Sequence, residues 1–233
     1  MSSAQNSKLK TKNFNLLPCP RSLRILRGRF TLRERRPPAR RDRSKTSTPI
    51  IRFRQTDSAP NHPEGYALTI SPNGIEICFR EAGGLRAAAA TLRQLLRQYG
   101  RRLPCLKIRD WPDFPRRGVM LDVSRGRVPR LETLLELAER LADFKINELQ
   151  LYTEHTFAYR RYKSVWQNWG ALTGEEIRRI DARCRQLGID LVPNQNSFGH
   201  LRYFLEHPRL KRLAEVSEPY ESGGDAPSPT SDE

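Results

Sequence analysis

The most constraining feature of the sequence is a regular alternation of apolar runs and amphipathic segments in its second half. Short apolar runs at Gly118–Val123, Asn147–Tyr152 and Ile189–Val192 have the length and composition of buried strands. Two segments with helical spacing lie between them, one opened by Pro129 and the other by the capping-box sequence TGEE at residues 173–176. Because strands separated by helices pair in parallel, the pattern predicts an open doubly wound sheet or a (β/α)8 barrel.

The first half of the chain has a different order, in which strands come before a single helix. Alternating runs at Tyr66–Ile70 and Ile75–Phe79 flank an Asn-Gly pair, which is a strong signal for a hairpin. The next segment repeats apolar residues at helical spacing and ends at Gly100, so it predicts a helix that covers one face of the sheet. The other expected elements are a hairpin around Gly28 and strands near residues 50–53 and 103–108.

These patterns divide the chain into segments of different character. A small α+β domain is expected over residues 14–110, and the Pro-rich sequence around Trp111 begins a second domain that extends over residues 111–214. Polar composition predicts disorder at residues 1–13, and an acidic, Pro-, Gly- and Ser-rich composition predicts a disordered tail at residues 215–233.

The chain is strongly basic, with 42 Lys and Arg against 26 Asp and Glu, and a net charge of +16. Its densest basic run, Arg33–Lys45, contains two adjacent prolines and no aromatic residue. Non-specific phosphate binding is expected of such a run at low salt, but the aromatic stacking platform of a single-strand binder is missing. We therefore interpret residues 33–48 as a basic surface loop and expect no specific nucleic-acid partner.

The sequence also bears on compartment and cofactors. No run approaches the ~18 apolar residues of a membrane-spanning helix, and the first residues lack the apolar core of a secretory signal, which predicts a cytoplasmic protein without a membrane partner. The cysteines at 19, 78, 105 and 184 are widely spaced, which predicts reduced thiols and no metal site. No glycine-rich phosphate motif follows any strand, so no cofactor is expected.

Polar residues gather just after each of the three expected parallel strands. In a barrel these positions form the active-site face at the carboxyl ends of the strands. They are Asp122, Ser124 and Arg125 after the first strand, Thr153, Glu154 and His155 after the second, and Asn194, Asn196 and His200 after the third.

Three segments carry a resemblance to a known family: FPRRGVMLDVSR at 114–125, KINELQLYTEHTFAY at 145–159 and GIDLVPNQNSFGH at 188–200. They resemble the first three barrel strands of glycoside hydrolase family 20, the β-N-acetylhexosaminidases. The stretch from about Leu16 to Asp110 is similar to the small α/β domain that precedes the barrel in that family. The resemblance implies a small α+β N-terminal domain followed by an incomplete (β/α)8 TIM-type barrel of about three strands.

The resemblance also implies a mechanism, which is substrate-assisted retaining hydrolysis of terminal β-linked N-acetylhexosamines. In that family a Glu protonates the leaving oxygen and an adjacent Asp orients the N-acetyl group, and both follow the fourth barrel strand. Only three strands are recognised here, and the terminal Asp232-Glu233 follows no apolar strand. The catalytic pair is therefore expected to be absent, and this chain is expected to be inactive as it stands.

Three residues match functional positions of the family. Arg117, just before the first strand, matches an arginine that binds sugar hydroxyls with its planar donors. His200 matches the histidine of a carboxylate–histidine–glutamate relay that tunes the acid. Glu154 is the candidate for the outer carboxylate, with Thr153 and His155 as alternatives because the alignment is ambiguous by one residue.

Other positions depart from the family pattern or leave alternatives open. Asn196 and Gly126 stand where the family commonly has Asp and His, and the first change removes a charge near the sugar site. Asp122 is interpreted as a structural carboxylate at the end of its strand. Trp166 and Trp169 are candidates for stacking on a sugar ring, with core or loop packing as the alternative.

Three functions remain open from the sequence. The first is part of a hexosaminidase-like hydrolase, the second a non-catalytic module that binds N-acetylhexosamine-containing glycans or a protein, and the least favoured a basic nucleic-acid binder. Three strands of a barrel leave an open sheet edge and exposed apolar helix faces. A second chain that completes the barrel is therefore a candidate partner, and weak cooperative unfolding is expected of residues 111–214 alone.

Overall fold

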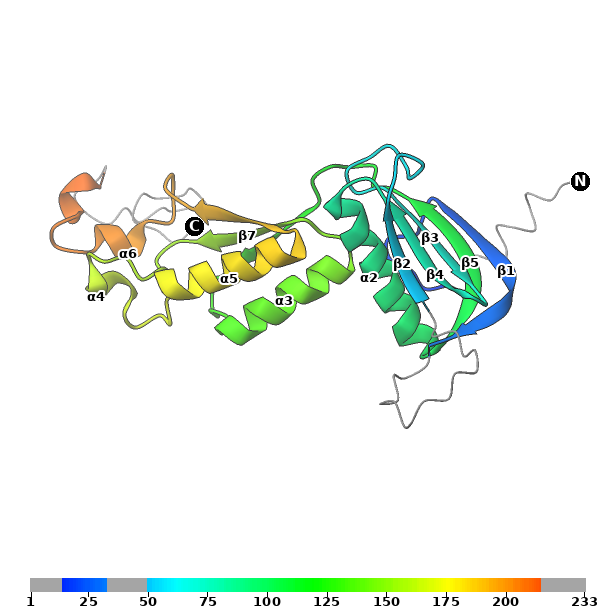
Figure 1. Cartoon of the computed structure of the whole chain (residues 1–233). Helices are drawn as coiled ribbons and strands as arrows, with labels where there is room; N and C mark the ends of the chain where they lie inside the picture. Colours follow the sequence, from blue (N-terminus) through cyan, green and yellow to red (C-terminus); the bar gives the residue numbers. More distant parts are fainter. Residues whose placement is uncertain (1–13, 33–49, 215–233) are drawn as a thin grey trace, which may run out of the picture. The chain divides into compact units, whose positions relative to one another are not determined.

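The computed structural model describes residues 14–32 and 50–214, which belong to two compact units. The first unit comprises residues 1–115 with 143–145, and the second comprises residues 116–142 with 146–233. Each unit combines strands and helices, so the chain has a mixed α/β fold (Figure 1). The disorder predicted at residues 1–13 and 215–233 and the basic loop predicted at 33–48 lie outside the described residues.

In its described residues, the first unit is a five-stranded sheet with one helix on one face (Figure 1). The strands follow the spatial order β1-β5-β3-β4-β2, and β3 and β4 form the predicted Asn-Gly hairpin. β2 joins β4 in parallel, and the remaining pairs are antiparallel. The elements are β1 (Ser22–Thr31), β2 (Ile50–Gln55), β3 (Tyr66–Ser71), β4 (Gly74–Phe79), α2 (Ala82–Tyr99) and β5 (Arg102–Asp110).

Helix α2 packs on the sheet through small side chains and one leucine. Ala87, Ala88 and Leu95 are buried in the core, whereas Leu92 and Leu96 are only partly buried against it. The alanines let the helix axis approach the sheet, Leu95 fills the core, and the other two leucines cover the sides of the contact. The predicted helix and the sheet face that it covers are confirmed.

The hairpin expected around Gly28 is wrong. β1 is one ten-residue strand that pairs along its length with β5, with an irregularity between Ile25 and Arg29. Gly28 has a φ of +104°, a conformation that favours glycine and that here bends the strand without reversing it. A lone glycine between apolar runs therefore marks a bulge in this chain.

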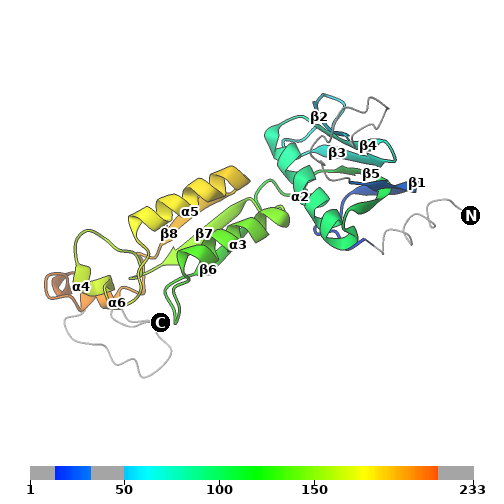
Figure 2. The same ribbon diagram turned by 60° about the horizontal axis from the view of Figure 1, so that its bottom comes forward.

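The second unit is a three-stranded parallel sheet in the order β6-β7-β8, with α3 and α5 on one face (Figures 1 and 2). The predicted strands, their parallel pairing and both predicted helices are confirmed. Leu134 of α3, Leu149 of β7 and Ile180 of α5 are fully buried between the sheet and the helices. The elements are β6 (Gly118–Asp122), α3 (Leu131–Asp143), β7 (Glu148–Thr153), α4 (Lys163–Trp166), α5 (Gly174–Leu187), β8 (Asp190–Gln195), α6 (Arg202–Leu205) and a 3-10 turn (Lys211–Leu213).

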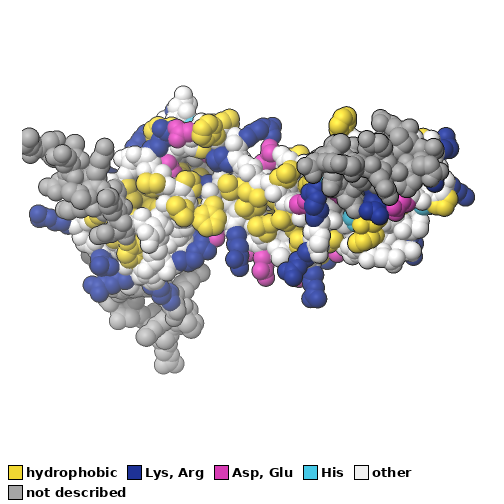
Figure 3. All heavy atoms as spheres, turned by 180° about the vertical axis from the view of Figure 1, so that it is seen from behind, with side chains coloured by type: hydrophobic (Ala, Val, Ile, Leu, Met, Phe, Trp, Pro, Cys, Tyr) yellow, Lys and Arg dark blue, Asp and Glu magenta, His cyan; other side chains and the backbone are white. Residues whose placement is uncertain are grey.

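The other face of this sheet carries no helix among the described residues. Strand alternation points Glu148, Gln150 and Tyr152 away from the helices, since Leu149 and Leu151 are buried against them. Met120 lies on the same face and is 60% exposed. The view from behind shows hydrophobic side chains among polar ones on this side (Figure 3). The face is thus neither a fully solvated surface nor a packed core.

The two long helices of the second unit begin differently. α3 starts at Leu131, two residues after the proline that was expected to open it. The first helical hydrogen bond runs from Leu134 N to the carbonyl oxygen of Arg130, at 3.1 Å. α5 starts as predicted, because the Thr173 side chain accepts from Glu176 N and the Glu176 side chain accepts from Thr173 N. Gly188, in the left-handed conformation at φ 76°, ends α5.

The capping box gives a modest stability prediction. Thr173→Ala removes the acceptor for Glu176 N, and we expect the opening free energy of the first turn of α5 to fall by about 1 kcal/mol. Amide exchange of residues in that turn is expected to accelerate about fivefold, measured by NMR or mass spectrometry. Thr173→Ser keeps the hydroxyl and serves as the control. An equal acceleration in both variants would contradict the assignment of the cap.

The described residues bear on the state of the cysteines and on membrane insertion. All four cysteines are free thiols, and burial raises the pKa of Cys184 to about 11, which keeps it protonated and unreactive at neutral pH. No helix within residues 14–32 or 50–214 combines the length and the apolar character needed to cross a lipid bilayer.

Candidate functional site at the carboxyl edge of the parallel sheet

The loops that follow β6, β7 and β8 meet at one edge of the second unit, because the three strands are parallel and in register. Asp122 is opposite Tyr152, and Tyr152 is opposite Asn194, so the residues just beyond these positions are neighbours. The sequence predicted this gathering of polar side chains after the strands. The contacts at this edge show which of them interact.

Glu154 is the buried centre of the site. Its side chain is 7% exposed, and its Oε1 atom accepts a hydrogen bond from Tyr152 OH at 2.8 Å. Arg125 Nη2 lies 3.3 Å from the same oxygen, and the backbone N–H of Glu154 donates to Ser124 Oγ at 2.7 Å. A buried carboxylate needs such partners to remain charged. The loop after β6 and the end of β7 therefore hold Glu154 as a fixed carboxylate.

The neighbouring groups show the effect of this carboxylate. Partial burial, with the hydrogen bond to Glu154, raises the pKa of Tyr152, while the hydrogen bond from Asn196 opposes the rise. Desolvation lowers the pKa of Arg125, but its bonds to Asp122 and the charge of Glu154 outweigh this and raise it. Tyr152 thus stays a neutral donor and Arg125 a permanent cation beside Glu154.

His200 approaches Glu154 from the loop after β8. Its Nδ1 atom lies 3.9 Å from Glu154 Oε1, and its side chain is 21% exposed. His200 has a φ of 54°, a left-handed conformation that is uncommon outside glycine and is enriched at functional sites. The structure therefore brings together the two residues that the sequence placed in one relay, although they are 46 positions apart.

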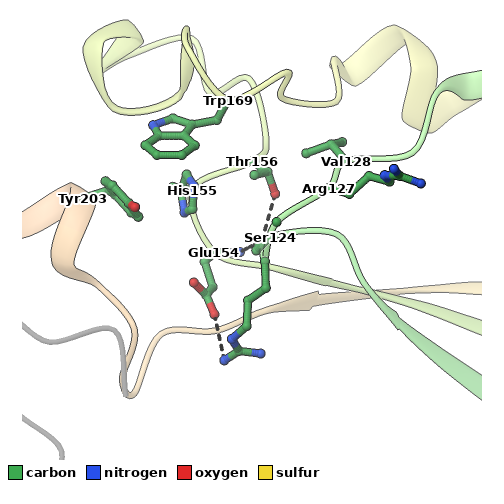
Figure 4. Close-up of a pocket in the computed structure, with 10 residues that line it drawn as sticks. Ser124, Arg127, Val128, Glu154, His155, Thr156, Trp169 and Tyr203 are labelled. Carbon is green, nitrogen blue, oxygen red and sulfur yellow. Dashed lines mark hydrogen bonds and ion pairs between the residues drawn. The ribbon is translucent and has the colours of Figure 1, made fainter.

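A cavity of about 350 Å³ opens beside Glu154. His155 is buried in its wall, with its ring centroid 4.9 Å from that of Trp169 and 4.1 Å from that of Tyr203 (Figure 4). Ser124 and Thr156 line the opposite side, and their hydroxyl oxygens lie 2.8 Å apart. An aromatic wall facing hydroxyl groups suits a ligand with both an apolar ring face and hydroxyls.

The alternatives to Glu154 are placed elsewhere. Thr153 lines a separate groove with Ile177 of α5, on the helix side of the sheet, and its hydroxyl donates to Leu151 O at 3.2 Å. His155 stacks with aromatic rings in the cavity wall. Of the three candidates, Glu154 is the one whose carboxylate faces His200.

The two tryptophans also separate. Trp169 lines the cavity and is 44% exposed, whereas the indole N–H of Trp166 donates to Tyr159 O at 2.9 Å, away from the cavity lining. Trp166 therefore has a packing role in its loop. Trp169 is the tryptophan that is placed to contact a ligand in the cavity.

Arg117 is not part of this cluster. It precedes β6, at the amino edge of the sheet, where its backbone N–H donates to Asn147 Oδ1 at 2.8 Å. Because a strand rises about 3.3 Å per residue, the five residues of β6 separate it from the carboxyl edge by roughly 16 Å. The structure does not bring Arg117 next to Glu154 and His200.

The remaining predicted positions have structural partners. Asp122 accepts from Ser124 N at 2.8 Å and from Arg125 Nη1 at 2.5 Å, so it fixes the loop after β6. Asn196 Nδ2 donates to Tyr152 OH at 2.6 Å, and its carbonyl oxygen accepts from Gly199 N at 3.2 Å. Asn196 therefore links the His200 loop to Tyr152, a role that the sequence did not suggest.

Sequence reasoning missed two contributors to the site. Tyr152 was placed in its strand without a role, although its alternation with the buried leucines 149 and 151 signalled that it faces the open side. Tyr203 lies in the four-residue helix α6, and no local pattern pointed to its contact with His155. Within the described residues, no three His, Cys, Asp or Glu side chains are arranged to hold a metal ion.

Comparison with known proteins finds similarity to one family. Residues 32–111 match the family model described as glycosyl hydrolase family 20, domain 2. A β-hexosaminidase of Akkermansia muciniphila is 29% identical over 158 residues, covering 59% of this chain and 32% of that protein. The chain is similar to members of glycoside hydrolase family 20. A β-N-acetylhexosaminidase of Cellulomonas fimi is 33% identical over 108 residues, which cover 44% of this chain and 21% of that protein.

Solved structures of family 20 proteins are also similar to this chain. The exo-β-N-acetylglucosaminidase of Vibrio harveyi, determined in complex with N-acetylglucosamine, superposes with a TM-score of 0.69 and 25% identity. The match covers 88% of this chain and 39% of that one, so it includes both units. The chain spans about a third or less of the length of the curated relatives named above.

Proposed function

We propose that this chain forms the N-terminal domain and the first strand–helix units of the (β/α)8 catalytic barrel of a β-N-acetylhexosaminidase. The observation that carries the proposal is the meeting of Glu154 and His200 at the carboxyl edge of a parallel sheet, beside an aromatic-lined cavity. The substrate class would be terminal β-linked N-acetylhexosamine, since the relatives compared above are a β-N-acetylhexosaminidase and an exo-β-N-acetylglucosaminidase. The remaining strands would come from residues outside this chain or from a second chain.

In this proposal His200 and Glu154 support the acid and do not carry out the chemistry themselves. Nδ1 lies 3.9 Å from the carboxylate, beyond hydrogen-bond distance. The proposal requires the two groups to approach one another, and the carboxylate would then hold the imidazole proton on Nδ1. Nε2 is then the ring atom that would meet a glutamic acid supplied after a fourth strand. The imidazole would tune that acid for protonation of the leaving oxygen. The acetamide of the substrate would act as the nucleophile, so no protein nucleophile is required.

The proposal leads to a direct test with a chimera. Residues 1–214 of this chain are joined to the part of the A. muciniphila enzyme that follows its aligned segment. We expect this chimera to hydrolyse p-nitrophenyl N-acetyl-β-glucosaminide and the 233-residue chain alone to be inactive. A chimera that is folded by circular dichroism but shows no turnover would contradict the proposal, as would turnover by the chain alone.

Arg117 remains a proposed sugar ligand. Its position at the amino edge means that its side chain must reach the sugar along the inner face of the sheet. If it binds sugar hydroxyls, Arg117→Ala raises KM in the chimera. If its role is confined to the backbone hydrogen bonds with residues 147 and 148, which alanine retains, the variant leaves KM unchanged.

A non-catalytic carbohydrate-binding module is the second candidate, and the cavity beside Glu154 favours it because its lining lies wholly within this chain. Both candidates predict that Trp169 contacts the sugar. We expect Trp169→Ala to weaken binding of N,N′-diacetylchitobiose to the isolated chain about tenfold, measured by NMR titration, since an aromatic face loses its stacked ring. Trp166→Phe is the matched control and should change the affinity less than twofold.

The two candidates are then separated by the chimera. Saturable binding to the isolated chain together with an inactive, folded chimera would favour the module. If the Trp169 variant and the wild type bind with the same affinity, the cavity is not the sugar-binding site under either candidate function.

A further inference from the structure

The sheet of the first unit has a second face, which α2 does not cover, and the strand register gathers basic side chains on it. Leu23 and Ile108 point toward the helix and are opposite one another, so the next pair, Arg24 and Lys107, points away from it. By the same alternation Arg109 lies on the outer face, opposite Ala67. At the opposite edge of the sheet, and on the same outer face, Arg52 and Arg54 of β2 are opposite Glu76 and Cys78 of β4. We call Arg24, Arg52, Arg54, Lys107 and Arg109 the basic sheet face.

The charges on this face are poorly balanced. All five side chains are on exposed residues, and Glu76 is the acid that the register places among them. Glu76 lies 3.6 Å from Arg54, whereas no carboxylate of the described residues lies within 4.0 Å of Arg24, Arg52 or Lys107. Arg24 and Lys107 are direct cross-strand neighbours, an arrangement that costs stability in the free protein.

The cations form two clusters separated by β3 and β4, which contribute small side chains and the single acid Glu76. Arg24, Lys107 and Arg109 lie on β1 and β5, while Arg52 and Arg54 lie on β2 at the opposite edge of the sheet. Since neighbouring strands are about 4.8 Å apart, three strand spacings place the clusters about 14 Å from each other. Thr69 and Ala67 of β3 lie between them.

We propose that the basic sheet face binds an acidic polysaccharide, a glycan chain whose sulfate or carboxylate groups reach both clusters. Guanidinium groups grip sulfate and carboxylate oxygens in pairs, and four of the five cations are arginines. An anion between Arg24 and Lys107 would also relieve their mutual repulsion. The face involves no residue of the cavity beside Glu154, so the proposal goes beyond the hydrolase function and does not depend on it.

A glycan suits this face better than nucleic acid does. Single-stranded nucleic acid is held by aromatic side chains, and the outward positions described on the three strands that carry these clusters have none. Duplex DNA carries one charge per ~1.7 Å of its axis, so its phosphates would cross the carboxylate of Glu76 between the clusters. The spaced charges of a glycan avoid it.

The test compares two variants of the whole chain that lose the same charge. Arg24→Gln/Lys107→Gln/Arg109→Gln removes three cations from the face, and Arg40→Gln/Arg41→Gln/Arg43→Gln removes three from the basic run outside the described residues. The probe is a size-defined heparin octasaccharide in 0.15 M NaCl, with binding measured by calorimetry. We expect the face variant to raise Kd at least tenfold and the run variant less than threefold.

Other results would overturn the proposal. Equal losses in both variants would mean binding by net charge alone, and a larger loss in the run variant would place the site in the basic run. A 20-base-pair duplex that binds more tightly than the octasaccharide and is lost in the face variant would make nucleic acid the occupant. Unchanged melting temperatures of both variants establish that the exposed substitutions leave the fold intact, and Arg52→Gln/Arg54→Gln independently tests the second cluster.

Discussion

His200→Ala in the chimera is expected to lower kcat for the nitrophenyl glycoside about 100-fold, with KM changed less than threefold. The reason is that His200 faces Glu154 and would act on the acid only as protonation of the leaving group proceeds. Loss of an interaction made in the transition state lowers kcat without weakening substrate binding. Steady-state kinetics on the two purified proteins provide the measurement.

Glu154 gives this prediction its internal check. Glu154→Gln keeps the size of the side chain but removes the charge that faces Nδ1, so it is expected to lower kcat by a similar factor. Residues that act as one unit are not additive, and the double variant should therefore be little slower than either single variant. His207→Ala, which changes a histidine stacked on Tyr162, is the matched control and should keep kcat within twofold. Additive losses, or a normal kcat in His200→Ala, would exclude the relay.

Gly84→Ala is expected to destabilise the first unit by about 2 kcal/mol or more. A Cβ atom at residue 84 would lie 2.2 Å from the carbonyl oxygen of Gly65 and 3.2 Å from Phe79 Cβ. The nearest obstacle is backbone, which cannot rotate away, so the helix must shift from the sheet and loosen the core beneath Ala87 and Ala88. The gain of about 1 kcal/mol in helix propensity does not offset this.

Amide exchange of β3 and β5 in the whole chain measures the effect on the first unit alone. We expect faster exchange there and no change in β7. Gly174→Ala is the matched control, since its Cβ would meet only the end of the Arg178 side chain at 3.8 Å. That variant should be neutral or slightly stabilising. Normal exchange in Gly84→Ala would show that α2 does not pack as closely as the structure indicates.

Most of the helices and strands were predicted correctly because residues within each element, or directly beside it, specify where it begins and ends. The Asn-Gly pair specified the hairpin of β3 and β4, and the capping box specified the start of α5. Gly28 was misread because a local sequence does not distinguish a bend from a reversal. What decides is pairing with β5, about 80 residues away, which the sequence of β1 does not encode.

The site was predicted in part for the same reason. His200 and Glu154 were identified through the resemblance, and the structure places them side by side. Tyr152 and Tyr203 were missed as contributors, and Asn196 was identified without its link to Tyr152, because these roles depend on contacts between separate loops. A polar residue after a strand indicates where a site lies, but its partners follow only from the register of the sheet.

The central claim is that this chain is the leading part of a family 20 hexosaminidase. Its most direct test is the native product, captured with an antibody against residues 50–110, weighed intact by mass spectrometry and assayed for hydrolysis of the nitrophenyl glycoside. The account predicts a species well above 27.0 kDa that is active, or a 27.0 kDa species that is active only with a second captured chain. Activity of a lone 27.0 kDa chain, or a longer product without activity, would contradict it.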